Sequence, residues 1–224
     1  MRWPVPTQSP QYASLSAALL VVASLASSGC TAPAPASFAS GTATASSRDL
    51  PAQIALGRQM VVSHGCGGCH GGGDAVPGAP GWLQGVRDTS MEFQIGPFRT
   101  RPRNLTPDNS TGLGRFTERQ IFNAIRYGLR PEDTPDVEVT SSTPGQGNFP
   151  LHPHYLAPPM PWPAFRHMSD EELYAIAAYL KNGLKPIVNR VAESEGPPDF
   201  WASIYTAQQI GTYPVEKYPT VNEK

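Results

Sequence analysis

Two cysteines and a histidine lie within one five-residue segment, Cys66-Gly-Gly-Cys69-His70. Two thiols three positions apart can both reach the vinyl groups of one porphyrin, and the adjacent imidazole can then bind its iron. The spacing C-x-x-C-H is the signature of c-type haem attachment. The sequence therefore predicts one covalent haem c, with Cys66 and Cys69 as attachment residues and His70 as the proximal ligand of the iron.

A C-x-x-C pair also occurs in thioredoxin-like redox sites and in zinc sites. The redox site needs a βαβ unit, and no such sequence pattern surrounds Cys66. A zinc site needs a second pair of cysteine or histidine ligands, but no cysteine follows Cys69. Both interpretations stay open as alternatives to the more specific haem motif.

The beginning of the chain has the pattern of an export signal. Arg2 and several polar residues precede an apolar run of about a dozen residues, at 15–26. Crossing a bilayer takes roughly 20 apolar residues, so this run is too short for a permanent transmembrane helix. We therefore expect residues 1–29 to be a signal peptide that is cleaved during export to the periplasm.

The third cysteine, Cys30, ends a stretch of small residues that resembles a bacterial lipobox. Lipidation there would make Cys30 the first residue of the mature protein and anchor it to a membrane. Ser27 stands where a lipobox usually has a large aliphatic residue. The alternative is ordinary cleavage within residues 32–45, which would discard Cys30. Residues 30–50 are small and unpatterned, and we expect a flexible tether.

Two helices are predicted around the motif and near the end of the domain. Residues 52–64 carry an apolar stripe of helical period that leads directly into the C-x-x-C-H segment. The other helix begins with a capping box, in which Ser169 is the N-cap and Glu172 is the third helical residue. Gly183 and Pro186 end it.

A third helix is predicted between them, because Thr117 and Gln120 form a second capping box and Gly128 gives the stop signal. No segment shows the alternation of apolar and polar residues that a half-buried strand needs. The fold class is therefore mostly α, with long irregular connections rich in proline and glycine.

Together these segments resemble a class I c-type cytochrome domain, and the resemblance covers residues 52–188. The segments that carry it are 66–70, 160–165 and 169–180, while 104–108, 111–114 and 116–117 are similar to cytochrome subunits that accompany bacterial periplasmic dehydrogenases. The resemblance implies that the first and last helices cross at a glycine and an aromatic residue, here Gly57 and Tyr179. One departure is the long spacing between His70 and Met160, which includes the proline-rich residues 131–159.

Met160 is the predicted sixth ligand of the iron. Prolines flank it on both sides, so its backbone is stiff, and a thioether held in this way is a suitable ligand that raises the reduction potential. His152, His154 or an open position are the alternatives. Met168 fits a hydrophobic staple before the last helix, and His64 is too close in sequence to the motif to reach the distal side.

The last segment, residues 189–224, is too aromatic for a disordered tail. Phe200, Trp201 and Ile204 fall at helical spacing after Asp199, a candidate helix cap. We expect this segment to be a strap that packs on the cytochrome c domain, which spans residues 51–188.

The charge balance and the resemblance together narrow the expected function. The chain has 224 residues, with 17 Lys and Arg against 18 Asp and Glu, so nothing indicates a nucleic-acid partner. We expect a periplasmic monohaem cytochrome c, and not an enzyme, that passes single electrons from a dehydrogenase to an oxidase or a soluble carrier. The alternatives are a haem enzyme, peroxidase-like or oxidising a small sulfur compound, with an open iron position, and a structural lipoprotein without haem.

Overall fold

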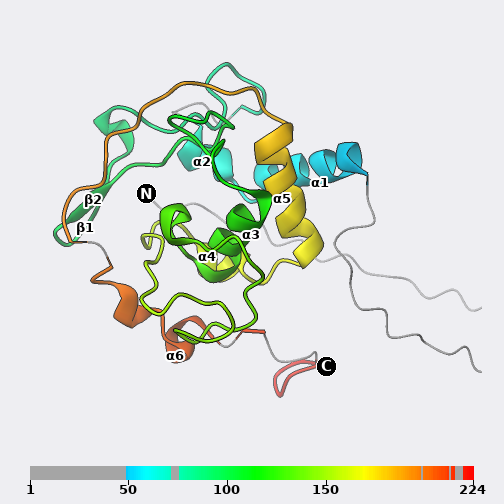
Figure 1. Ribbon diagram of the computed structural model, residues 1–224, viewed down its shortest axis with the longest axis vertical. Coiled ribbons are helices and arrows are strands. Elements are labelled where there is room, and N and C mark those ends of the chain that lie inside the picture. Colours follow the sequence, from blue (N-terminus) through cyan, green and yellow to red (C-terminus); the bar gives the residue numbers. More distant parts are fainter. Residues whose placement is uncertain (1–48, 72–75, 198, 212, 215–218) are drawn as a thin grey trace, which may run out of the picture. The chain divides into compact units, whose positions relative to one another are not determined.

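The computed structural model describes residues 49–71, 76–197, 199–211, 213–214 and 219–224 (Figure 1). Cys30, the predicted signal peptide and nearly all of the predicted tether lie outside the described residues. The helices are α1 (Leu50–Ser63), α2 (Cys66–His70), α3 (Glu118–Tyr127), α4 (Trp162–Phe165), α5 (Asp170–Asn182) and α6 (Ala207–Ile210), and the strands are β1 (Phe93–Ile95) and β2 (Phe98–Thr100). Three short 3-10 turns complete the described elements: η1 (Thr89–Met91), η2 (Pro131–Asp133) and η3 (Ala202–Ile204).

The three predicted helices are present, as α1, α3 and α5. Both capping boxes form: Thr117 with Gln120 begins α3, and Ser169 with Glu172 begins α5. Gly128 ends α3 with a φ of 69°, a conformation that favours glycine. The helix-rich fold agrees with the predicted mostly α class.

The first and last of these helices cross closely, as the resemblance implies (Figure 1). A Cβ atom on Gly57 would lie 1.8 Å from the Ala175 carbonyl oxygen and 2.8 Å from the Cβ atom of Tyr179. Only glycine lets the two backbones approach this far. The predicted crossing at Gly57 and Tyr179 is confirmed.

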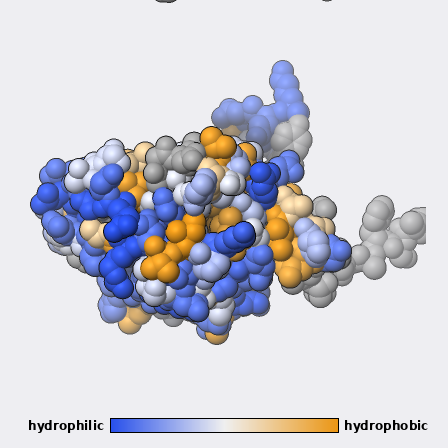
Figure 2. Space-filling view, turned by 90° about the horizontal axis from the view of Figure 1, so that it is seen from above, coloured by the Kyte–Doolittle hydropathy of each residue, from blue (hydrophilic) through white to orange (hydrophobic). Residues whose placement is uncertain are grey.

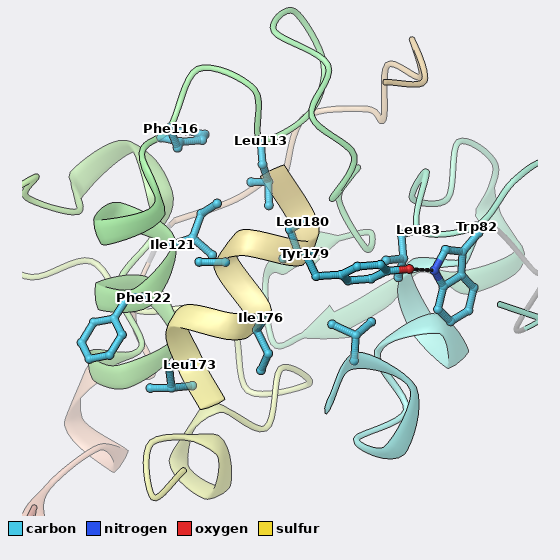
Figure 3. Close-up of a cluster of buried hydrophobic side chains, with 12 residues drawn as sticks. Trp82, Leu83, Leu113, Phe116, Ile121, Phe122, Leu173, Ile176, Tyr179 and Leu180 are labelled. Atoms are coloured by element: carbon cyan, nitrogen blue, oxygen red, sulfur yellow. Dashed lines mark hydrogen bonds between the residues drawn. The ribbon is translucent and has the colours of Figure 1, made fainter. Parts of the chain in front are cut away.

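The main core lies where α1, α3 and α5 meet. Its buried members are Val61, Trp82, Leu83, Leu113, Phe116, Ile121, Phe122, Leu173, Ile176, Ala177, Tyr179 and Leu180. Figure 3 shows Tyr179 extending from α5 towards Trp82, whose indole N–H donates a 3.0 Å hydrogen bond to the tyrosine hydroxyl. The hydrogen bond therefore connects Trp82, which follows α2 in the chain, to α5.

A short β-hairpin forms where the sequence shows no alternation of apolar and polar residues. β1 and β2 pair antiparallel, with Ile95 opposite Phe98 and a two-residue turn between them. Gly96 occupies the first turn position with a φ of 54°, as hairpin turns require. Each strand has three residues, too few to show a repeating pattern in the sequence.

The tail passes alongside this hairpin. Arg99 and Glu195 exchange backbone hydrogen bonds of 2.8 and 2.9 Å. The indole of Trp201 is buried, and it packs edge-on against Phe98 with ring centroids 4.7 Å apart. Residues 195 and 201 thus attach the end of the chain to β2.

The expected helix after Asp199 is wrong in its detail. Asp199 has a φ of 61°, and its side chain accepts a 2.9 Å hydrogen bond from the Tyr155 amide instead of capping a helix. The 3-10 turn η3 takes the place of the expected helix, and Phe200 and Ile204 are exposed. Of the three apolar side chains expected to pack, Trp201 alone is buried.

None of the helices in the described part of the chain is long and apolar enough to cross a bilayer. On the face shown in Figure 2, apolar residues form several separate areas within a mostly polar surface.

Candidate functional site

Helix α2 brings the three motif residues together within little more than one helical turn. Gly65 precedes it with a φ of 68°, so the chain turns sharply between α1 and α2. Cys66 and Cys69 are both free thiols and partly buried, and Cys66 packs against the main core. The predicted attachment residues are therefore close together and anchored to the helix crossing.

The two glycines between the cysteines differ in their surroundings. A Cβ atom on Gly67 would lie 2.0 Å from the Trp82 ring, so the indole packs directly on the α2 backbone. A Cβ atom on Gly68 would meet nothing within 4 Å. One side of α2 is therefore packed against the protein, and the side at Gly68 is open.

The His70 imidazole is held in one orientation. Its Nδ1 atom lies 2.7 Å from the Arg103 carbonyl oxygen. Because a carbonyl oxygen can only accept, Nδ1 carries the proton, and Nε2 keeps its lone pair. Metal-binding histidines are usually fixed in this way, through a hydrogen bond from the other ring nitrogen.

Burial shifts the titration of two motif side chains. It lowers the pKa of His70, an effect that the Arg103 hydrogen bond partly opposes, so the neutral ring is favoured. Burial also raises the pKa of Cys66 to about 11, with a small further increase from Cys69. Cys66 is therefore a thiol at neutral pH, whereas the reactive cysteine of a thioredoxin-like redox site is a thiolate.

The loop that supplies the Arg103 carbonyl is itself fixed by a buried polar cluster. The Asn104 side chain donates to the Ile187 carbonyl at 2.8 Å and accepts from the Thr106 amide at 2.9 Å. Asp108 accepts from both the amide and the hydroxyl of Thr111, at 2.6 and 2.7 Å. This order in residues 104–111 keeps the hydrogen-bond acceptor of His70 in place.

A cavity of about 440 Å³ lies next to this loop. It is lined by residues 110–113, 190–191 and 193–194 among others, by Leu156 and Ala157, and by four arginines, Arg103, Arg115, Arg130 and Arg190. Its volume is in the range of small-molecule sites. The motif residues of α2 and Met160 are not part of its lining, but Arg103, which binds His70 through its carbonyl, is.

Met160 lies at a bend just before α4 and is partly buried. Its amide donates to the Ala157 carbonyl at 2.9 Å, and its carbonyl accepts from the Trp162 amide at 2.8 Å. The backbone at Met160 is therefore fixed, and the segment 156–157 connects it to the cavity. The described contacts do not join Met160 to α2, and its role as the sixth ligand stays a prediction.

The other candidate ligands are engaged elsewhere or exposed. His154 has its Nδ1 atom 2.9 Å from the Asp133 carboxylate and its Nε2 atom 3.9 Å from the Asp199 carboxylate. His152 is exposed. Met168 packs against the main core, as a hydrophobic staple would, and His64 contacts the Met60 carbonyl at 2.9 Å.

No family model matches the chain, but curated proteins do. The cytochrome c subunit of alcohol dehydrogenase (quinone) from Gluconacetobacter polyoxogenes is 33% identical over 96 residues, which cover 43% of this chain and 15% of that subunit. The gluconate 2-dehydrogenase cytochrome c subunit of Pantoea cypripedii is 26% identical over 147 residues, 65% of this chain and 26% of the relative. The fructose dehydrogenase cytochrome subunit of Gluconobacter japonicus is 24% identical over 135 residues, which cover 60% of this chain and 22% of that subunit.

The chain thus spans about a quarter or less of the length of each of these relatives. All three are cytochrome subunits of dehydrogenases. The matches support a cytochrome c-like domain.

Two features that surround the motif could not be found from the motif itself. Arg103 acts through its backbone carbonyl, which carries no sequence signal. Trp82 and Tyr179 are 97 positions apart, so their hydrogen bond has no local pattern. Among the described residues, no three His, Cys, Asp or Glu side chains are grouped to hold a metal ion by themselves. A haem iron needs only axial ligands, because the porphyrin supplies the other four.

Proposed function

We propose that the chain is a monohaem c-type cytochrome that transfers single electrons between a donor dehydrogenase and an acceptor in the bacterial cell envelope. The observation that carries the proposal is the arrangement on α2. The two thiols lie on one short helix, and the His70 ring is oriented by the Arg103 carbonyl with Nε2 left to bind a metal. The relatives support it, because they are cytochrome subunits of dehydrogenases.

The residues present fit a covalent haem. Cys66 and Cys69 would form the thioether bonds, His70 would bind the iron through Nε2, and the open side at Gly68 leaves room beside the helix. In the cavity next to Arg103, Arg103 and Arg115 pair with Glu193 and Glu132 of the same lining, so a haem carboxylate would bind Arg190 or replace one of these pairs. When bound, the haem supplies one-electron chemistry at its iron.

Met160 is the proposed sixth ligand. The hydrogen bonds to Ala157 and Trp162 fix its backbone, and the flanking prolines stiffen it further. A histidine and a methionine together favour electron transfer over substrate binding, because they leave no open position at the iron.

The rest of the proposal concerns the location of the protein in the cell and its electron acceptor. Residues 1–29 would direct export to the periplasm, and a lipid on Cys30 would anchor the domain to a membrane. The acceptor would be an oxidase or a soluble carrier. An anchored domain on a flexible tether could exchange electrons with partners near that membrane.

Three single cysteine variants test the attachment and the anchor together. The full-length protein is produced in a bacterium with a cytochrome c maturation system and examined by mass spectrometry and by the pyridine haemochrome spectrum. We expect Cys69→Ser and Cys66→Ser to disrupt covalent haem attachment. Cys30→Ser is the matched control and should keep the haem while the protein leaves the membrane fraction. Undiminished haem in Cys69→Ser would overturn the proposal.

Two methionine variants test the sixth ligand. Met160→Ala should abolish the weak near-infrared methionine-to-iron band of the oxidised protein, lower the reduction potential and allow cyanide to bind. Met168→Ala is the control, because it removes a methionine from the core and should leave the spectrum unchanged. An unchanged band in Met160→Ala would exclude this ligand, and loss of the low-spin spectrum in His154→Ala would favour the histidine alternative and a haem enzyme.

A further inference from the structure

A second cavity, of about 310 Å³, is separate from the one beside Arg103. Six aromatic side chains form most of its walls: Tyr127, Phe149, Tyr155, Trp162, Tyr205 and Tyr213. They come from α3, the loop after it, α4 and the tail, which lie near one another in Figure 1. The exposed residues 142–144 also line the cavity, so it is open to solvent.

The aromatic walls support one another. Tyr127 and Phe149 pack edge to face with ring centroids 5.8 Å apart, and Trp162 and Tyr205 do the same at 5.1 Å. Tyr155 lies nearly parallel to Trp162, with 6° between the ring planes. Such contacts hold the rings in fixed orientations, so the cavity is preformed rather than created by a ligand.

Arg166 is the charged side chain in this lining. The residue is only 4% exposed, and its Nε atom is buried without a hydrogen-bond partner. The guanidinium lies over the Tyr213 ring, 4.9 Å from its centroid, and 5.6 Å from that of Trp162. These rings shield the cation but supply no full negative charge.

The neighbouring Arg126, by contrast, has partners for its charge and its N–H groups. It forms an ion pair with Asp170 and donates to the carbonyl oxygens of Arg166 and Met168. The two arginines are close enough to oppose each other's charge, and burial together with Arg126 lowers the pKa of Arg166. Among the described ion pairs, Asp170 pairs with Arg126 and none includes Arg166.

We propose that this aromatic cavity binds a small planar aromatic carboxylate, with its carboxylate on Arg166 and its ring against the tyrosine and tryptophan walls. A buried cation without a paired anion is costly, and a carboxylate matches the fork of a guanidinium. The volume is at the lower end of small-molecule sites, which suits an acid with one ring. This binding activity goes beyond electron transfer and does not depend on the haem.

A second unpartnered group in the cavity agrees with a polar, hydrogen-bond-accepting ligand. The Trp162 Nε1 atom is buried and has no hydrogen-bond partner. Burial raises the pKa of Tyr205, an effect that the neighbouring Trp162 indole partly opposes, and the Tyr205 hydroxyl donates a 3.3 Å hydrogen bond to the Leu156 carbonyl. A neutral hydrocarbon would leave both the Trp162 N–H and the Arg166 Nε–H unsatisfied.

Calorimetric titration of the full-length holoprotein with benzoate tests this proposal. Benzamide is the neutral probe of the same shape, and cyclohexanecarboxylate is the acid without a planar ring. We expect benzoate to bind at least about tenfold more tightly than either, because each lacks one of the two interactions. Equal binding of benzamide, or no binding of benzoate at millimolar concentration, would overturn the proposal.

Variants locate the site. Arg166→Gln should weaken benzoate binding about tenfold or more, while Arg87→Gln removes an exposed arginine elsewhere and should leave binding unchanged. If Arg166→Gln does not fold, Arg166→Lys keeps the charge but loses the fork, and it should bind benzoate more weakly than the native protein. Benzoate binding that is unchanged in a folded Arg166 variant would place the ligand elsewhere and refute the assignment.

Discussion

The two segments predicted to bind the iron are held by different kinds of interaction. Helix α2 rests on the crossing of α1 and α5, where apolar side chains and the Trp82 indole pack closely. The described part of residues 131–161, which leads to Met160, contains only η2. It lies along α3, whose Gln120, Asn123 and Tyr127 donate hydrogen bonds to its carbonyl oxygens.

These three donors stand at positions i, i+3 and i+7 of α3, so they share one helix face. They bind the carbonyls of residues 134, 135 and 139 in the same order along the chain, and Asn123 binds that of 137 as well. Damage to the apolar crossing should therefore unfold the whole domain. Damage to the polar contacts should loosen the loop and leave the rest folded.

The largest effect is expected at Trp82. Trp82→Ala removes a buried indole from between α2 and α5 and should lower the free energy of unfolding by about 3–5 kcal/mol, measured by urea denaturation. Tyr179→Phe removes only the hydrogen-bond acceptor and should cost about 1–3 kcal/mol. A loss below about 1 kcal/mol in Trp82→Ala would show that the indole is not part of the core.

The next effect is expected at the helix crossing. Gly57→Ala places a methyl group against the Ala175 carbonyl and should lower the free energy of unfolding by about 1–3 kcal/mol. Gly68→Ala is the matched control, because its Cβ atom meets nothing and alanine favours the helix by about 0.5–1 kcal/mol. Opposite changes in the two urea midpoints would support the described crossing, whereas equal changes would contradict it.

An effect of similar size, but confined to the loop, is expected at Asn123. Asn123→Ala leaves the Pro135 and Val137 carbonyls without their donor, at a cost of about 1–3 kcal/mol. Asn123→Asp keeps the shape but turns a donor towards carbonyl oxygens into an acceptor, so it should be worse at neutral pH. Hydrogen exchange should increase at residues 134–139 and change little in α5. Equal loss of protection in α5 would show that the loop and the core unfold together.

Removing either capping box should lower the free energy of unfolding by about 1 kcal/mol. Thr117→Ala and Ser169→Ala remove equivalent hydrogen bonds at the starts of α3 and α5. We expect Thr117→Ala to increase proteolysis of the loop on α3 as well, because the Thr117 hydroxyl also donates to Asp136 at 2.5 Å. Equal proteolysis in the two variants would argue against a coupling between the cap and the loop.

The smallest effect is a pH dependence at Asp108. Hydrogen bonds, first from the Thr111 hydroxyl and then from the Ser110 hydroxyl, lower its pKa from the ordinary 3.8. A carboxyl with a lowered pKa in the folded state stabilises the protein above its ordinary pKa, and this contribution disappears as the pH falls through the lowered value. Asp108→Asn should therefore flatten the melting temperature profile below about pH 4. An unchanged profile would assign the acid sensitivity to other carboxyls.

Local signals predicted the parts of the fold that depend on neighbouring residues. The capping boxes at Thr117 and Ser169 and the stop at Gly128 are set within a few positions, and all three form as expected. The C-x-x-C-H segment likewise shows its candidate chemistry in five residues. The helix crossing at Gly57 followed from the family resemblance, since a single glycine carries no indication of its partner.

Interactions between distant segments could not be predicted. Leu83 is fully buried with a φ of 61°, and its carbonyl accepts from the Leu105 amide, an arrangement that no local pattern indicates. Asp199 has the residue type of a helix cap, but its side chain accepts a hydrogen bond from the amide of Tyr155, 44 positions away. The donors on α3 have no sequence signal, because only the apolar face of that helix is periodic.

The bridge between Leu129 and Tyr155 affects how the chain can vary in length. The Arg130 amide also binds the His154 carbonyl, and the Leu156 amide binds the Gly128 carbonyl, so residues 130–154 leave and rejoin the domain at one point. Doubling the length of such a closed excursion costs only about 0.6 kcal/mol of chain entropy. Residues can thus be added or removed within 141–147 without moving the point from which the chain leads to Met160. Residues 130–154 therefore lengthen the spacing between His70 and Met160 and leave the path from Tyr155 to Met160 unaltered.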